Sequence, residues 1–140
     1  MIMVSHANPR DFNWHYNVPN WQWEGTVTIP SSPFSTAEIG VQVVGDENPL
    51  RCDQIELIER IIGWFPELKT LIVEKLLEYH PDLKDDEVFR TQLSDPAICL
   101  FEPEEIPVHS WTFTVYRPEA GLSYLIDFEE REFQSIWSGD

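Results

Sequence analysis

Cysteine, glycine and the basic residues are all scarce in this chain of 140 residues. The two cysteines, Cys52 and Cys99, are too few for a disulfide scaffold, although the sequence does not exclude a single disulfide between them. The six glycines are scattered and form neither a P-loop nor the G-x-G-x-x-G of dinucleotide-binding folds. The G-x-S-x-G, H-E-x-x-H and paired-cysteine motifs are also missing, which excludes the commonest nucleophile and zinc signatures.

The scarcity of bases gives the chain an extreme charge. Nine Lys and Arg stand against 25 Asp and Glu, for a formal net charge of -16. This charge disfavours direct binding to nucleic acid or to an anionic membrane, because both require a cationic surface. It favours a basic protein partner, which the negative field would attract at low salt. Acidity that serves only solubility is the alternative interpretation.

The length corresponds to about one domain. We expect residues 1–20 to form an irregular N-terminal arm, because Pro9 and Pro19 interrupt regular structure there, and residues 21–140 to form a single domain. The apolar start of the chain ends at His6, so no signal peptide is expected. No apolar run is long enough to span a bilayer, which predicts a cytoplasmic protein.

Alternating apolar and polar residues predict strands at both ends of this domain. Residues 21–29 and 37–44 alternate and are joined by a short loop, which predicts an antiparallel pair. Further strands are expected at residues 97–101, 111–116, 122–128 and 132–137. The Pro-Glu-Ala-Gly sequence at 118–121 predicts a hairpin turn.

Helical periodicity occupies the middle of the chain. It predicts a helix over residues 53–65, with Asp53 as its N-cap and Glu56 completing a capping box. Pro66 predicts a break, followed by a second helix that ends near His80. A third, short helix is expected over residues 85–93. The fold class is therefore α+β, with an antiparallel sheet of about five to six strands packed against two or three helices.

Candidate catalytic and metal-binding residues have simpler interpretations. His80 is placed to cap a helix C-terminus, and His109 stands at the start of a strand. The acidic run at 82–87 offers oxygen ligands but lacks the spacing of a calcium-binding loop. The carboxylates at 127, 129, 130 and 132 could supply a general acid and base, although a solvated surface is favoured. We therefore expect no enzyme activity, no metal and no cofactor.

The acidic segments carry the strongest functional signal. Residues 82–105 hold eight acids and two bases, and residues 117–140 hold six acids and two bases. Aromatic anchors with a charged rim are typical of protein-binding surfaces. The residues predicted to contact a partner are Asp82, Asp85, Asp86, Glu87, Glu102, Glu104, Glu105, Tyr116, Asp127, Glu129, Glu130, Glu132 and Trp137.

The layout of residues 21–140 resembles small acidic bacterial domains of unknown function. The segments that carry this resemblance are Trp23-Glu24-Gly25, the stretch from Trp111 to Tyr116, and the stretch from Tyr124 to Phe128. Several of these families look like immunity proteins of polymorphic toxin systems. The resemblance implies a cytoplasmic protein that binds a cognate toxin or effector domain and blocks it.

Three functions are therefore considered. The first is a protein-binding inhibitor, an immunity protein that neutralises a bacterial toxin by occluding a basic surface. The second is a nucleic-acid mimic, such as a phage-type inhibitor of a DNA-binding protein, which would carry its carboxylates in two rows at phosphate-like spacing. The third is an uncharacterised enzyme that uses paired carboxylates near Asp127.

Overall fold

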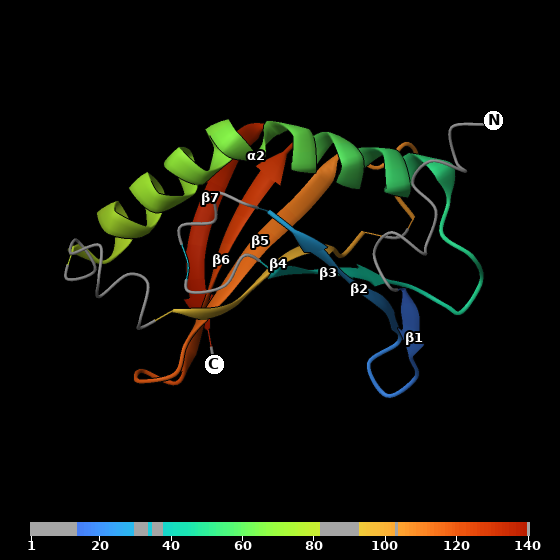
Figure 1. Cartoon of the computed structure of the whole chain (residues 1–140), viewed down its shortest axis with the longest axis horizontal. Coiled ribbons are helices and arrows are strands. Elements are labelled where there is room, and N and C mark those ends of the chain that lie inside the picture. The colour runs from blue at the N-terminus through green and yellow to red at the C-terminus, as the bar shows by residue number, and fades with distance from the viewer. Residues whose placement is uncertain (1–13, 30–33, 35–37, 82–92, 103, 140) are drawn as a thin grey trace.

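In the part of the chain that the structure describes, one long helix crosses a face of one seven-stranded sheet (Figure 1). A computed structural model describes residues 14–29, 34, 38–81, 93–102 and 104–139. The elements in chain order are β1 (His15–Asn17), β2 (Gln22–Thr28), β3 (Glu38–Val44), α2 (Cys52–Tyr79), β4 (Ser94–Leu100), β5 (Ser110–Arg117), β6 (Leu122–Glu129) and β7 (Glu132–Gly139).

The strands lie in the sheet in the same order as in the sequence. The expected pair β2–β3 and the expected hairpin β5–β6 are both antiparallel, which confirms those two predictions. The expectation of an antiparallel sheet is wrong at one place, because β3 and β4 are parallel. α2 lies between these two strands in the chain. It carries the chain back over the sheet to the end where β3 begins, so β4 runs parallel to β3.

Two expectations about the number of elements are also wrong. Within the described residues the sheet has seven strands, because β1 forms inside the N-terminal segment that was expected to be irregular and pairs with β2. A single helix runs through Pro66, where the sequence predicted a break. Pro66 is exposed, so the carbonyl that loses its intrahelical partner can face water. The third helix expected over 85–93 falls almost entirely outside the described residues.

The start of α2 also differs from the expected cap. Arg51 is the N-cap, and its backbone N–H donates to the side-chain oxygen of Gln54 at 2.9 Å. Asp53 lies in the first turn instead, where its carboxylate pairs with the Arg51 guanidinium at 2.9 Å. It also accepts the backbone N–H of Val108 at 2.8 Å, which ties the helix start to the loop before β5.

The core lies between α2 and the sheet face beneath it. Alternate residues of the strands point toward the helix, as the sequence pattern predicts for Trp111, Phe113 and Val115. Phe113 packs against Phe65 of α2, with ring centroids 6.1 Å apart. Trp111 stacks on Phe128 at 4.5 Å. The described chain contains no helix that is both long enough and apolar enough to cross a membrane.

Replacing Pro66 by alanine is expected to stabilise the protein. The variant restores one intrahelical N–H donor and removes the proline ring, so the free energy of unfolding should rise by about 1 to 2 kcal/mol. Gly63→Ala is the matched control in the same helix, because its added methyl group meets nothing within 4 Å and should add less than about 1 kcal/mol. Urea unfolding measures both. A loss of stability in Pro66→Ala would show that the helix requires a bend there.

Candidate functional site: an acidic groove on the far face

The sheet face opposite α2, which we call the far face, carries a row of polar side chains in register across five strands. Gln42 pairs with Cys99, Cys99 with Thr112, Thr112 with Asp127, and Asp127 with Ser135. The Cys99 thiol donates to the Gln42 side-chain oxygen at 3.3 Å. Because side chains alternate along each strand, none of these residues belongs to the core under the helix.

Asp127 is the centre of this row. Its Oδ1 accepts the Thr112 hydroxyl at 2.8 Å, and its Oδ2 accepts the Ser135 hydroxyl at 2.8 Å and the Trp137 indole N–H at 3.1 Å. These three donors are neutral. No lysine or arginine among the described residues forms an ion pair with Asp127, so its position is fixed while its negative charge stays uncompensated.

A groove of about 330 Å³ opens beside Asp127, at the end of the sheet where β4 stops. We call it the acidic groove. Phe101, 40% exposed, and the carboxylates of Glu102 and Glu129 line it together with Asp127. Its remaining lining residues are Ser110, Trp111, Thr112, Phe128 and Gln134. An apolar wall with carboxylates around it matches the composition expected of a contact surface for a basic group.

Four of the six lysines and arginines in the described ranges form ion pairs with residues that do not line the acidic groove. Their ion pairs join Arg51 to Asp53, Arg60 to Glu130, Lys75 to Glu78, and Arg131 to Glu67. Each of these pairs includes a residue of α2 or its N-cap. Among the described residues, the acids that line the acidic groove, Glu102, Asp127 and Glu129, therefore form no ion pair with a lysine or an arginine.

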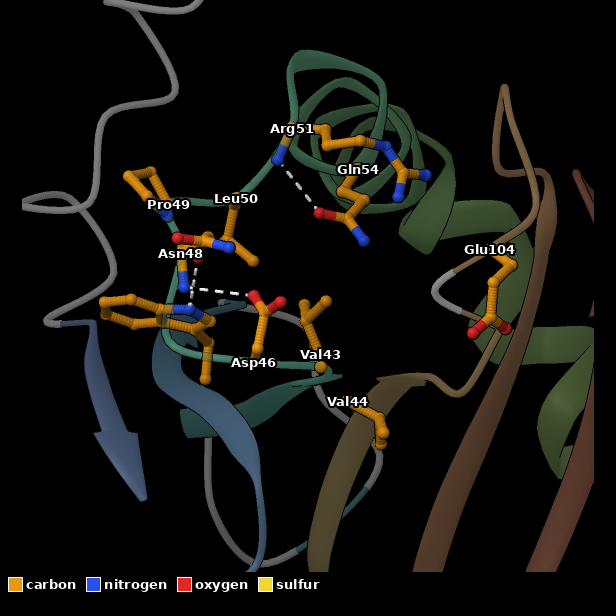
Figure 2. A pocket seen from close by; sticks show the side chains of 11 residues that line it. Val43, Val44, Asp46, Asn48, Pro49, Leu50, Arg51, Gln54 and Glu104 are labelled. Atoms are coloured by element: carbon orange, nitrogen blue, oxygen red, sulfur yellow. Dashed lines mark hydrogen bonds between the residues drawn. The ribbon is translucent and has the colours of Figure 1, made fainter. Parts of the chain in front are cut away.

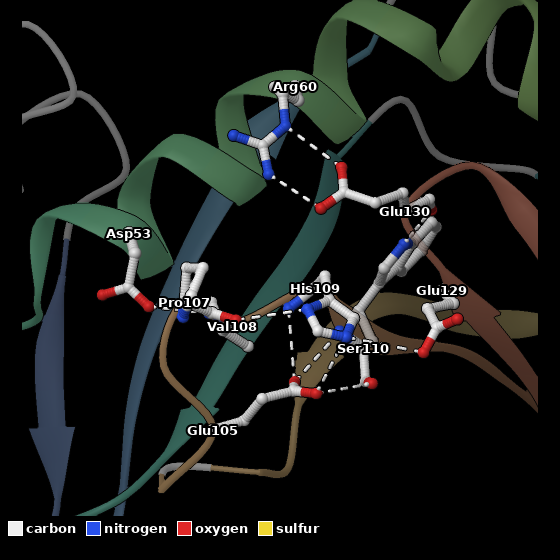
Figure 3. Close-up of polar contacts among 10 residues, drawn as sticks. Asp53, Arg60, Glu105, Pro107, Val108, His109, Ser110, Glu129 and Glu130 are labelled. Atoms are coloured by element: carbon white, nitrogen blue, oxygen red, sulfur yellow. Dashed lines mark hydrogen bonds and ion pairs between the residues drawn. The ribbon is translucent and has the colours of Figure 1, made fainter.

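The loop between β4 and β5 is built around Glu105 (Figure 3). Its carboxylate accepts the backbone N–H groups of His109 and Ser110, each at 3.2 Å, and the Ser110 hydroxyl at 3.2 Å. Burial acts to raise the pKa of Glu105, but these donors and the nearby His109 outweigh it, and the pKa is lowered. His109 Nε2 contacts Glu105 at 3.2 Å and Glu129 at 3.5 Å, so it links this loop to the rim of the acidic groove.

The structure brings together some of the residues that the sequence predicted as a contact surface. Glu102, Asp127 and Glu129 line the acidic groove, and Trp137 binds Asp127 at its side. Glu132 is exposed and lies opposite Glu129 in the register of the β6–β7 hairpin.

Other predicted contact residues lie apart from the groove. Glu105 organises its own loop, and Glu130 holds Arg60 of α2 through two hydrogen bonds (Figure 3). Glu104 lines a different pocket, and Tyr116 lies near the far end of β5. Asp82, Asp85, Asp86 and Glu87 lie outside the described residues.

A second pocket, of about 340 Å³, lies between the end of β3 and the start of α2 (Figure 2). Several of its polar groups bind one another. The Trp23 indole N–H donates to the Asn48 carbonyl at 3.0 Å, and the Asn48 N–H donates to Asp46 at 3.0 Å. These contacts hold the loop that leads into the helix, and we assign the pocket a structural role.

The other residues considered for chemistry are the two cysteines, His80 and the possible metal ligands. Cys52 and Cys99 are both free thiols, so the possible bridge does not form. Burial raises the pKa of Cys99 to about 11, which leaves its thiol protonated and unreactive at neutral pH. His80 is the C-cap residue of α2, where the sequence placed it, and its ring packs on Tyr124 at 5.2 Å. Within the described ranges, no three His, Cys, Asp or Glu residues cluster closely enough to hold a metal ion.

Sequence reasoning missed the neutral half of the site. Thr112 and Ser135 fix the Asp127 carboxylate, and Phe101 supplies the apolar wall. The alternation along residues 111–116 does place Thr112 and Trp111 on opposite faces of the sheet, which was a usable signal that Thr112 lies outside the core. The cross-strand register that aligns these residues with Asp127 is a tertiary property and has no counterpart in the local pattern.

Comparisons of the chain with protein-family models, with curated proteins and with solved structures gave no match.

Proposed function

We propose that this chain is a protein-binding inhibitor, an immunity protein that neutralises a cognate bacterial toxin by covering a basic surface of it. The observation that supports this proposal most is the environment of Asp127. Neutral donors hold its carboxylate in place beside Trp137, whose side chain is 47% exposed. Tryptophan is among the residues most enriched at interface hot spots.

The charge distribution supports the same proposal. A basic residue of the partner that enters the acidic groove meets Glu102, Asp127 and Glu129. Two of these side chains are already positioned, Asp127 by three hydrogen bonds and Glu129 by contact with His109, so less conformational freedom is lost on binding. The net charge of -16 accelerates the approach of such a partner.

General acid catalysis by the hydrogen-bonded carboxylates of Glu24, Asp53 and Glu105 has less support. A general acid at neutral pH requires a raised pKa. The pKa of Glu24 is lowered, mainly by its hydrogen bond from Gln22, and the pKa of Glu105 is lowered as well. The pKa of Asp53 is lowered too, chiefly by its hydrogen bond from Arg51.

A pull-down from the native host, eluted with rising salt, tests the proposal. We expect one basic protein that is retained at low salt and leaves only at high salt, and whose toxic activity the chain suppresses. A captured DNA-binding protein that loses its DNA would point to the nucleic-acid mimic instead. Recovery of many proteins that modest salt removes would contradict specific inhibition.

Replacing Trp137 by alanine is expected to weaken binding of the captured partner about 30-fold or more, because it removes a hot-spot side chain. Trp21→Ala is the matched control, since Trp21 is 63% exposed and lies in the turn between β1 and β2, distant from the groove in the strand order. Titration calorimetry of both variants gives the dissociation constants. Equal effects of the two replacements would place the interface elsewhere.

A further inference from the structure

We propose that the partner supplies an extended basic segment that pairs with β7 and becomes an eighth strand of the sheet. β7 is the last strand in the sheet order, and within the described chain it pairs only with β6. It is eight residues long, whereas β1 at the opposite edge has three. A long edge strand presents a row of backbone N–H and C=O groups on its open side, which another strand can bind.

β7 lacks two of the features that protect many edge strands. It contains no proline and no lysine. An irregularity in register near Phe133 disturbs its first half, but Ser135 to Gly139 pair with β6 residue by residue. Five regular residues are enough for an added strand of ordinary length.

The side chains along β7 indicate which sequence would fit beside it. Ser135 and Trp137 lie on the far face, where both donate to Asp127. A lysine or arginine placed next to them would meet the Asp127 carboxylate and the face of the Trp137 ring. Ile136 points the other way and packs against the core. A segment in which basic and aliphatic residues alternate therefore complements the edge.

Charge also favours a basic partner strand over a second copy of the chain at the β7 edge. Two copies that paired through β7 would bring together two molecules of net charge -16 each, which repel one another. A cationic strand gains from the same field. The inference rests on the proposed function only in taking the partner to be basic.

The test uses the full chain and a synthetic peptide of eight residues that alternates lysine with valine. Hydrogen exchange of the β7 amides is followed by NMR with and without the peptide. We expect new protection at alternate residues between Ser135 and Gly139, because only every second backbone amide points outward. A peptide that alternates glutamate with valine is the charge control and should give no protection.

Backbone N-methylation of the lysine peptide removes its hydrogen-bond donors without altering the protein. Two versions, methylated on the lysines or on the valines, block its two edges in turn. At least one of them should bind about tenfold more weakly or worse. Equal binding of both methylated peptides and the parent would overturn the inference, and so would concentration-dependent dimers that protect β7 without peptide.

The outcomes distinguish this inference from the proposed function. Absence of any peptide effect on β7, together with capture of a basic protein that Asp127→Asn weakens, would refute strand addition and leave the inhibitor proposal standing. Protection of β7 by the lysine peptide without capture of any basic protein from the host would support the edge site and refute the inhibitor proposal.

Discussion

Replacing Trp111 by alanine should lower the free energy of unfolding by about 3 to 5 kcal/mol, the usual range for removing a buried aromatic side chain. Trp111 is 2% exposed and stacks on Phe128 with ring centroids 4.5 Å apart. Its indole N–H donates to the Glu130 carbonyl at 2.6 Å, so the variant also leaves a carbonyl of the β6–β7 turn without its donor. Chemical denaturation followed by circular dichroism measures the loss.

Trp137→Ala is the matched control for this experiment. Trp137 lies on the far face, about half exposed, and its replacement should change stability by less than about 1 kcal/mol. The two variants therefore separate stability from binding, because Trp111→Ala should mainly lose stability and Trp137→Ala should mainly lose affinity for the partner. A Trp111→Ala protein as stable as the wild type would contradict the position of this side chain in the core.

Removing the Asp53 carboxylate should cost about 2 kcal/mol at neutral pH. Asp53→Ala breaks the ion pair with Arg51 and leaves the Val108 backbone N–H without its acceptor. Urea unfolding at pH 7 measures this loss. The control is Glu56→Ala, one turn later on the exposed side of the helix, which should change stability by less than about 0.5 kcal/mol.

The Asp53 contribution should also depend on pH in a defined direction. The hydrogen bond from Arg51 lowers the pKa of Asp53 in the folded protein. A carboxylate with a lowered folded pKa stabilises fully above its unfolded pKa of about 3.9, and this stabilisation is lost as the pH falls through the folded pKa. The difference between wild type and Asp53→Ala should therefore shrink below about pH 4. A difference that stayed constant down to pH 3 would show that the ionised carboxylate is not the stabilising species.

Much of the fold could be predicted because apolar and polar residues alternate clearly along its strands.

The error at Pro66 shows what local rules leave out. The apolar stripe keeps its helical spacing across the proline, with buried residues at 58, 61, 65, 68, 72 and 76. Packing of this stripe against the sheet outweighs the local preference of proline to end a helix. The unbroken phase of the stripe was the signal for one helix.

The acidic groove could be predicted only in part for a related reason. Composition identified Asp127, Glu129 and Glu102 as acids in the charged segments, but it could not show which of 25 acids lie together. That depends on the register between β5, β6 and β7 and on the parallel pairing of β3 with β4, which α2 imposes. It also depends on which acids the α2 region neutralises, as Arg60 does for Glu130.

The most direct test of the inhibitor proposal compares two triple variants that lose the same number of charges. One neutralises the groove, with Glu102→Gln, Asp127→Asn and Glu129→Gln, and the other neutralises exposed acids of α2, with Glu56→Gln, Glu59→Gln and Glu74→Gln. Affinity for the captured basic protein should fall at least about 30-fold in the groove variant and only a few-fold in the helix variant. Equal losses in the two variants would mean that net charge alone attracts the partner, and would contradict a binding site at the acidic groove.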